Sequence, residues 1–382
     1  YFFEQMHMDD AIYADESIYE YPMQQGGGND GRPYSFGRPS SGGSKAAYPC
    51  KSYGQGRINP AYFYGVFDPN DMRRDVSITM TGSNGKGVEK LIPFVPNSKA
   101  EGGGLTLNKW DENRQANPWV AAQRKSGING PYMRMSEVYL GYAEVCAALG
   151  DVVTGKQYLK TVRERSFPQG LANTDAFIAS FGNDLVRAII EERGFEYAGE
   201  GDRRWTLIRS GYLPEDIKRI KDMTKAMMDG LATKGYYEFE NGNIISAYIW
   251  TKLVDAKTIY GHRLTAQCPT DKVNDPVLYP GWRGQKDNWE EMGLNYGSST
   301  PATNLAIKGL FEIVSEEEAA SLESQGYAKV NWGIDLVDYR DEYDKYLFWD
   351  YDYVSAPIYL WPFTPNVMAA GGFTNGYGFK QE

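Results

Sequence analysis

Apolar residues recur every three or four positions through the middle of the chain, which predicts a run of amphipathic helices. The first helix is expected from Pro131 to Gly150, because proline suits a first helical turn and glycine suits the position after a helix end. Further helices are expected at 155–165, 174–193 and 214–231. The first two would form a pair about the size of a tetratricopeptide unit. The stripe expected to face the core in the first helix consists of Met135, Val138, Tyr139, Tyr142, Cys146 and Leu149.

The segments on either side of this helical block are irregular and rich in glycine and aromatic residues. A strand is expected at 76–80, and a hairpin at 236–249 around the turn Asn241-Gly242-Asn243. A helix is expected near 301–313, a capping box at Ser315 predicts another, and the tail from 332 to 377 is predicted to be a loop. The sequence therefore predicts a mainly α protein, a tetratricopeptide-like helical scaffold with long aromatic-rich loops and minor β.

Composition narrows the classes of function. The chain has 40 Lys and Arg against 50 Asp and Glu, a net charge of −10, which argues against a nucleic-acid-binding protein. His7 and His262 are its two histidines, so most zinc sites and most histidine acid–base chemistry are excluded. Three cysteines without CxxC spacing predict no disulfide framework. Cys146 is expected to be buried, whereas Cys50 and Cys268 lie in loop-like segments and could pair.

The first residues, YFFEQMHMDD, read like the middle of a protein and contain no signal peptide. No stretch reaches the roughly 18 apolar residues of a membrane span. We therefore expect an N-terminal portion to be missing, and with it any export signal or lipid anchor.

Motifs for catalysis are weak. The chain contains no nucleophile elbow. A glycosidase requires two carboxylates at a set separation, and a sequence alone does not show that separation. Gly150-x-x-x-x-Gly155-Lys156 resembles a phosphate-binding loop, but Gln157 follows where a hydroxyl residue would bind Mg²⁺. We expect no catalytic residue, no metal and no cofactor.

Aromatic residues are unusually frequent, with 29 Tyr, 16 Phe and 9 Trp. Sugar rings present apolar C–H faces that stack on aromatic rings, while their hydroxyls need polar partners nearby. Loops that combine both kinds of residue are therefore candidate carbohydrate sites. The candidate ligand-binding residues are Tyr34, Tyr53, Arg57, Asn59, Tyr62, Tyr64, Trp282 and Trp289.

Several motifs resemble those of the SusD/RagB family of Bacteroidetes nutrient-uptake lipoproteins. Residues 190–211, IEERGFEYAGEGDRRWTLIRSG, are similar to the family signature, with Thr206 where aspartate is usual. The helices RMSEVYLGYAEVCAALG (134–150) and YLKTVRERS (158–166), the loop FDPNDMRRD (67–75) and the tail 360–378 resemble further family segments in the same order. The signature residues are Glu192, Arg193, Glu196, Glu200, Arg203 and Arg209.

We interpret the signature as a structural charge network instead of a binding site. Glu192, Glu196 and Glu200 recur every four residues, so they would share one face of a helix. Arg193, Arg203, Arg204 and Arg209 are expected to bridge them and neighbouring loop carbonyls. A buried charge cluster of this kind is a poor catalytic site.

The resemblance implies a non-catalytic, lipid-anchored protein on the outside of the outer membrane. It would capture oligosaccharides and pass them to a SusC-like TonB-dependent transporter barrel; the lipid anchor would lie outside this chain. The alternative is a peptide-binding or structural subunit of a transporter or other envelope complex. On this view residues 1–130 form a loop-rich, ligand-facing region, 131–235 the helical core and 236–382 a second loop-rich region, all within one domain.

Overall fold

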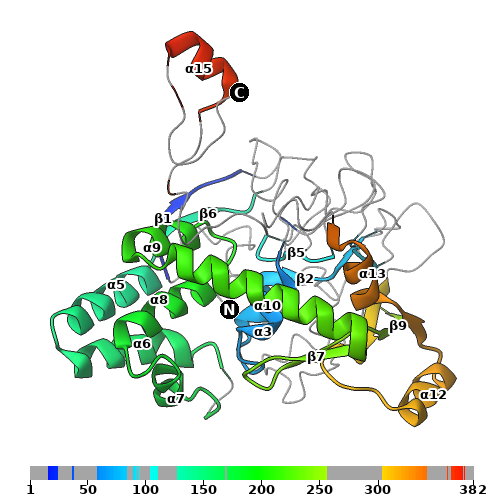
Figure 1. Ribbon diagram of the computed structural model, residues 1–382. Coiled ribbons are helices and arrows are strands. Elements are labelled where there is room, and N and C mark those ends of the chain that lie inside the picture. Colours follow the sequence, from blue (N-terminus) through cyan, green and yellow to red (C-terminus); the bar gives the residue numbers. More distant parts are fainter. Residues whose placement is uncertain are drawn as a thin grey trace.

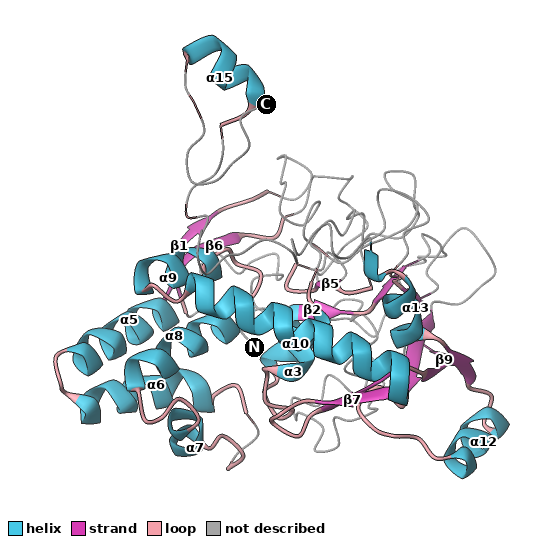
Figure 2. Ribbon diagram, in the orientation of Figure 1, coloured by secondary structure: helices cyan, strands magenta, loops and turns pink. Residues whose placement is uncertain are grey.

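Helices dominate the described part of the chain, as predicted for a mainly α protein (Figures 1 and 2). The computed structural model describes residues 16–24, 37, 58–83, 89–92, 94, 104–110, 127–167, 170–255, 303–341, 359, 363–372 and 374. The helices are α3 (Pro60–Gly65), α4 (Arg73–Ser77), α5 (Met135–Ala148), α6 (Val152–Glu164), α7 (Thr174–Ala179), α8 (Leu185–Glu196), α9 (Arg203–Ser210), α10 (Leu213–Lys234), α12 (Glu316–Ser324), α13 (Trp332–Asp338) and α15 (Pro365–Gly371).

The strands are short and form small antiparallel sheets. They are β1 (Ser17–Tyr21), β2 (Ile78–Thr79), β3 (Thr81–Ser83), β4 (Glu89–Leu91), β5 (Thr106–Leu107), β6 (Gly130–Arg134), β7 (Tyr236–Glu238), β8 (Ile244–Ser246), β9 (Ile249–Asp255), β10 (Thr303–Lys308) and β11 (Ala328–Val330). β1 pairs with β6, β2 with β5, β3 with β4 and β7 with β8, while β9 lies between β10 and β11. The predicted hairpin at 236–249 is present as β7 and β8.

Helices α5 to α9 form a stack at one end of the long helix α10 (Figure 1). The Asp151 side chain accepts the Thr154 N–H and so begins α6, and Asp184 begins α8 in the same way through Arg187. The single helix predicted at 174–193 is wrong. It is divided into α7 and α8, because Asn183 adopts a positive φ of 65° that no α-helix continues.

Three further expectations from the sequence are wrong. Pro131 lies in strand β6, so the helix begins later, at Met135. Of the predicted strand at 76–80, residues 76–77 belong to α4. The helix expected near 301–313 is strand β10, whose residues 303–308 pair with β9 over their whole length. This segment forms a strand because it pairs with β9, which lies about fifty positions away in the sequence, and no local pattern shows that pairing.

The C-terminal region is more ordered than predicted. The capping box is present, with the Ser315 hydroxyl accepting the Glu318 N–H, and it opens α12. The tail predicted as a loop contains α13 and α15. The N-terminus of α13 is docked on the turn after β8, where the Gly333 N–H donates to the Ala247 carbonyl at 2.8 Å.

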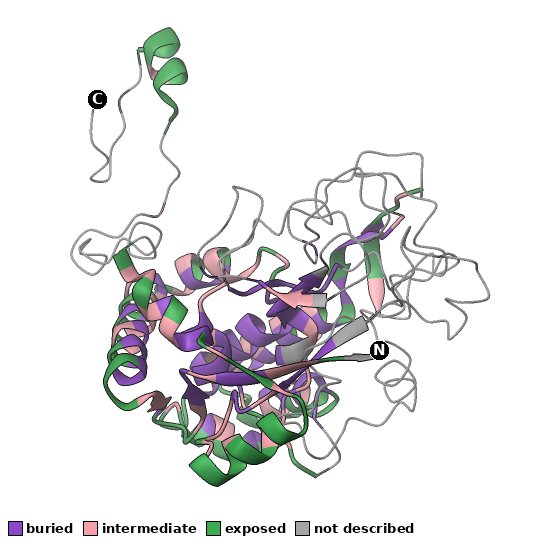
Figure 3. Cartoon of the chain, turned by 90° about the vertical axis from the view of Figure 1, so that its right-hand side faces the viewer, coloured by how far each residue is buried: buried purple, intermediate pink, exposed green. Residues whose placement is uncertain are grey.

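One hydrophobic core joins all three predicted regions. Figure 3 shows the buried residues of the described part of the chain in purple. It contains Phe67 from the first region, Phe195 and Met227 from the second, and Ile307 and Trp332 from the third. A core shared in this way supports the proposal that the regions form one domain. Among the helices of the described residues, none has the length and apolar character that crossing a bilayer would require.

Helix α5 buries a different face from the one predicted. Its buried residues are Ser136, Leu140, Ala143 and Cys146, which face α8 and α6. Of the predicted stripe, Cys146 is buried and Tyr139 is half-buried, whereas Met135, Val138, Tyr142 and Leu149 are exposed. The error arose because α5 is apolar on two sides, so periodicity alone could not show which side faces the core.

Candidate functional site

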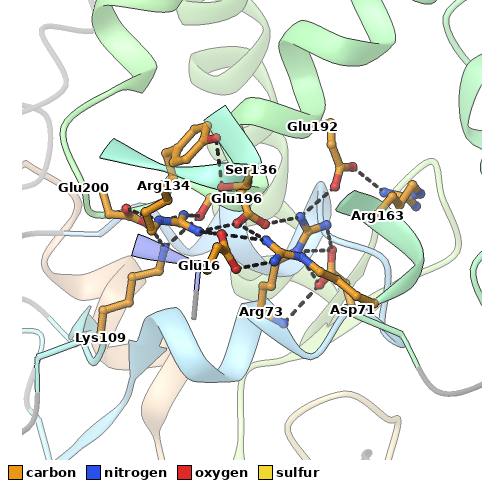
Figure 4. Close-up of polar contacts among 12 residues, drawn as sticks. Glu16, Asp71, Arg73, Lys109, Arg134, Ser136, Arg163, Glu192, Glu196 and Glu200 are labelled. Carbon is orange, nitrogen blue, oxygen red and sulfur yellow. Dashed lines mark hydrogen bonds and ion pairs between the residues drawn. The ribbon is translucent and has the colours of Figure 1, made fainter. Parts of the chain in front are cut away.

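The family-like motifs, far apart in the sequence, meet in one buried network of charges (Figure 4). Helix α8 contributes Glu192 and Glu196, and Glu200 follows in the next turn. The cations come from four other segments. They are Arg73 at the start of α4, Lys109 after β5, Arg134 at the end of β6, and Arg163 and Arg165 at the end of α6.

Glu196 is at the centre of this network and is 2% exposed. Its Oε1 accepts from Arg134 Nη1 at 2.7 Å and from Arg165 Nη2 at 2.5 Å, and its Oε2 accepts from Arg73 Nη1 at 3.0 Å. Charge-assisted hydrogen bonds of this length are the strong class. One carboxylate thus joins the end of α6, the start of α4 and strand β6.

The neighbouring carboxylates extend the network on either side. Glu192 accepts from Arg73 Nη1 at 2.6 Å and from Arg163 Nη1 at 2.9 Å. Glu200 accepts from Arg134 Nη2 at 2.9 Å and from Lys109 Nζ at 2.7 Å. Each charged side chain of this network therefore has an opposite charge beside it, which buried ions require.

The prediction that Arg193, Arg203 and Arg209 bridge these glutamates is wrong, although Arg203 does donate to a backbone carbonyl, that of Ile190, at 3.2 Å. Arg193 donates to Asp202 at 2.6 Å and Arg209 to Glu144 at 2.8 Å, while Arg203 pairs with Glu191 and Asp216. Cations from distant segments hold the glutamates instead. Thr206, which replaces the usual aspartate, accepts from Arg193 Nε at 3.2 Å and donates to Asp202 at 2.8 Å.

Burial and neighbouring charges act in opposite directions on these groups. Burial raises the pKa of Glu196, but Arg134, Arg165 and Arg73 outweigh it and hold the pKa well below the usual value. The pKa of Glu16 is lowered in the same way, with burial opposed by Arg165 and Arg134. For Lys109, burial outweighs the Glu200 carboxylate and lowers the pKa. The two carboxylates are thus held ionised inside the protein.

A pH dependence of stability follows from these lowered carboxylate pKa values. The stabilisation is complete above the unfolded pKa of glutamate, about 4.3, and is lost as pH falls from there toward the lower folded pKa. We expect the free energy of unfolding, measured by urea titration from about pH 7 to about pH 3, to fall steeply in the acid range. Glu196→Gln should flatten that slope. An equal slope in wild type and variant would contradict the role given to Glu196.

The predicted ligand-binding residues fall into two groups. Tyr34, Tyr53, Arg57, Trp282 and Trp289 lie outside the described residues and stay predictions, as does any Cys50–Cys268 pair. The other three lie at or in helix α3, between α10 and the core.

The expectation that Tyr62 and Tyr64 lie in loops is wrong, because both belong to helix α3. Tyr64 is 2% exposed and packs edge-on against Phe311, and Tyr62 packs edge-on against Phe63 and Phe67. Asn59 begins α3: its side chain accepts the Ala61 N–H and donates to Thr224. Asn-Pro before a dense aromatic run is itself a helix-start pattern, which was the signal that these rings belong to a packed helix.

Three other tyrosines, which the sequence did not single out, face solvent on the ribbon of β1 and β6. Tyr19 and Tyr21 are 58% exposed and Tyr132 is 62% exposed. The rings of Tyr19 and Tyr132 meet edge-on, with centroids 5.9 Å apart. Glu20, between Tyr19 and Tyr21, is buried and accepts from Asn129 at 2.9 Å. The burial of β1 does not alternate regularly, because its pairing with β6 contains register shifts, so the sequence offered no simple signal for these tyrosines.

The charge network holds the ribbon of β1 and β6 in place. Arg134, the last residue of β6, donates to Glu16, immediately before β1, at 2.6 Å and to Glu196 at 2.7 Å. The Glu16 carbonyl also accepts the Met135 N–H at 2.8 Å. The tyrosines therefore project from a rigid support. Within the described residues, no cluster of His, Cys, Asp and Glu is arranged to hold a metal ion.

Comparison with known proteins identifies the family. Residues 11–364 match the sequence profile of the SusD family. The chain belongs to the SusD family. The network of Figure 4 thus shows what the SusD signature does in this chain: it connects α8 to four segments that are distant in sequence.

The chain is also similar to individual SusD relatives. It is 28% identical over 160 residues to SusD-like protein P25 of Formosa agariphila, covering 42% of this chain and 26% of that protein. A SusD homologue of Bacteroides thetaiotaomicron is 19% identical, with a TM-score of 0.44 over 59% of this chain and 47% of that one. Surface glycan-binding protein A of the same species, in complex with laminarihexaose, is 17% identical, with a TM-score of 0.38 over 55% and 45%. The matches therefore span less than half the length of these relatives.

Proposed function

We propose that this SusD-family chain is a non-catalytic surface protein that captures oligosaccharides and passes them to a TonB-dependent transporter. It would act on the outer face of the outer membrane, held there by a lipid anchor, with the transporter barrel as its partner. Family membership supports this assignment. The structural observation that carries it is the group of three outward tyrosines on a ribbon fixed by the charge network.

The chemistry of this surface suits a sugar. Tyrosine offers an apolar ring for the C–H face of a pyranose and a hydroxyl for its polar rim. A ribbon that is already ordered loses little conformational entropy on binding. Binding should nevertheless be weak, because each sugar hydroxyl exchanges a bond to water for a bond to protein at small net gain. Weak capture is what delivery to a transporter needs.

Calorimetric titration with a panel of oligosaccharides, laminarihexaose among them, and with a panel of peptides tests the assignment. We expect saturable binding of at least one glycan. If peptides bind and no glycan of the panel binds, the peptide-binding alternative would replace this proposal. Release of reducing sugar from any bound glycan would overturn the non-catalytic part.

Substitution of the ribbon tyrosines provides a prediction at residue level. Tyr19→Ala and Tyr132→Ala should each weaken glycan binding by roughly 3- to 10-fold, because a stacked aromatic contributes about 0.5–1.5 kcal/mol. Both rings are exposed, so the melting temperature should change little. Tyr327→Ala is the control: this half-buried tyrosine follows α12 and precedes β11 in the chain, and α12 lies at the opposite end of the molecule from β1 and β6 in Figure 1. Unchanged affinity in both ribbon variants would move the site to the loops outside the described residues.

A further inference from the structure

Helix α9 presents a tryptophan to solvent. Trp205 is 54% exposed, whereas the other tryptophans of the described residues, Trp110, Trp250 and Trp332, are at most 4% exposed. Tryptophan is highly buried on average, and its large, rigid ring makes a strong contact wherever a ligand covers it. A single exposed ring does not by itself mark a site. The groups around Trp205 therefore decide what it can bind.

The surroundings of Trp205 combine open space with polar groups. Side chains in a helix lean toward its N-terminus, so the indole lies toward Gly201, where a Cβ atom would meet nothing within 4 Å. Asp202 and Arg209, three residues before and four residues after Trp205, share its face of the helix. Arg209 is exposed and donates to Glu144 at 2.8 Å, and this pair offers donors and acceptors at the surface. An apolar ring beside exposed polar groups is the combination that a sugar requires.

Hydrogen bonds connect the start of α9 to the ribbon of β1 and β6. Arg134, the last residue of β6, donates from Nε to Glu200 at 3.0 Å, and Glu200 lies two residues before Asp202, where α9 begins. Figure 1 shows α9 beside both strands. Tyr132 and Trp205 therefore project from two elements that the charge network holds together.

The charge that faces solvent between these elements is negative. Glu137 lies in the first turn of α5, just after the ribbon, and its side chain is 42% exposed. The nearby Arg193 side chain is only 6% exposed, and its Nη2 contacts Glu137 at 3.7 Å and Asp202 at 2.6 Å. The exposed carboxylate would repel a uronic acid or a sulfated sugar, whereas the hydroxyls of a neutral sugar can donate to it. This surface therefore favours an uncharged glycan.

On the basis of the function proposed for the ribbon, we infer that Trp205 is a second aromatic subsite for the same glycan. The ligand is then an uncharged oligosaccharide long enough to contact both Trp205 and the ribbon tyrosines. Contact at the second subsite is intramolecular once the first is occupied, so it adds affinity only for a chain that spans the distance. A short sugar gains one contact and a long one gains both. The surface thus selects glycans by length.

Binding constants for glycans of increasing length test this selection. Laminari-, cello- and malto-oligosaccharides, from disaccharide to hexasaccharide, are titrated by calorimetry. In at least one series we expect the hexasaccharide to bind at least about tenfold more tightly than the disaccharide. Trp205→Ala should weaken hexasaccharide binding by roughly 3- to 10-fold, and Trp205→Phe, which keeps an aromatic ring, should retain most of it. Because Trp205 is exposed, both variants should fold.

Tyr142→Ala is the control for these variants. Its ring is 49% exposed but packs edge-on against Tyr158 of α6, with centroids 5.0 Å apart, so its loss should leave the length dependence unchanged. Oxidation of tryptophan by N-bromosuccinimide, followed by peptide mass spectrometry, provides an independent readout. The hexasaccharide should slow the oxidation of Trp205, with the buried Trp250 and Trp332 as internal references.

Each contrary outcome has a distinct meaning. Wild-type binding of the hexasaccharide that neither protects Trp205 nor weakens in Trp205→Ala would overturn the second subsite and leave the ribbon as the site. Tighter binding of uronic acid oligomers than of the neutral series would overturn the assignment to an uncharged glycan. If the wild type binds no glycan of any series, the function proposed for the ribbon fails, and the second subsite fails with it.

Discussion

Glu196→Gln is expected to destabilise the protein by about 3–5 kcal/mol, the usual cost of removing one partner from a buried ion cluster. The carboxylate lies between Arg73, Arg134 and Arg165, and the amide would remove the one negative charge that all three arginines share. The side chain keeps its shape, so the loss reports on charge and not on a cavity. Chemical denaturation followed by circular dichroism measures it.

Glu164→Gln is the matched control for this variant. Glu164 forms an exposed pair with Lys160, 3.4 Å away and one helical turn before it. Exposed pairs of this kind contribute less than about 1 kcal/mol, so stability should be almost unchanged. If Glu196→Gln were no more destabilising than Glu164→Gln, the SusD signature would not have the structural role assigned to it.

Gly104→Ala is the second substitution for which we expect a large loss of stability. Gly104 has a φ of +79°, and a Cβ atom there would lie 2.0 Å from the ring of Phe94. The ring is 1% exposed and packs against Trp332, with centroids 4.9 Å apart, so it has little room to move. Backbone strain of about 1–2 kcal/mol and overpacking of about 1–3 kcal/mol add to roughly 2–5 kcal/mol.

Gly201→Ala separates these two contributions. Gly201 has a φ of +95°, but nothing lies within 4 Å of the position of its Cβ. Only the backbone strain of about 1–2 kcal/mol is therefore expected. Equal losses in the two variants, measured by thermal and urea unfolding, would show that the contact with Phe94 is unimportant.

The sequence was most informative where structure depends on neighbouring residues. Helix α10 and the capping box at Ser315 were predicted because their signals lie within a few positions. Strand β10 was taken for a helix because its pairing with β9 crosses about fifty residues. Helix α5 was predicted as a helix with the wrong buried face, since both of its sides are apolar.

The candidate site shows the same division. Family motifs marked Glu192 and Glu196 correctly as members of a charge network, but their partner Arg73 lies 119 and 123 positions away, which no local pattern reveals. Aromatic residues near polar ones suggested Tyr64, which is buried, and Tyr62, which is half-buried, and passed over Tyr19 and Tyr132, which face solvent. Composition shows that aromatic residues are abundant, and only packing decides which of them are exposed.

The long sequence separations within the charge network also have a consequence for the order of folding. Closing a loop of more than a hundred residues costs entropy before any contact compensates for it, so contacts between α4 and α8 should form late, after local pairs such as α5 with α6. Interactions absent from the transition state affect mainly the rate of unfolding. The arginine–glutamate cluster would then contribute little to how quickly the chain folds and much to how long the native state persists.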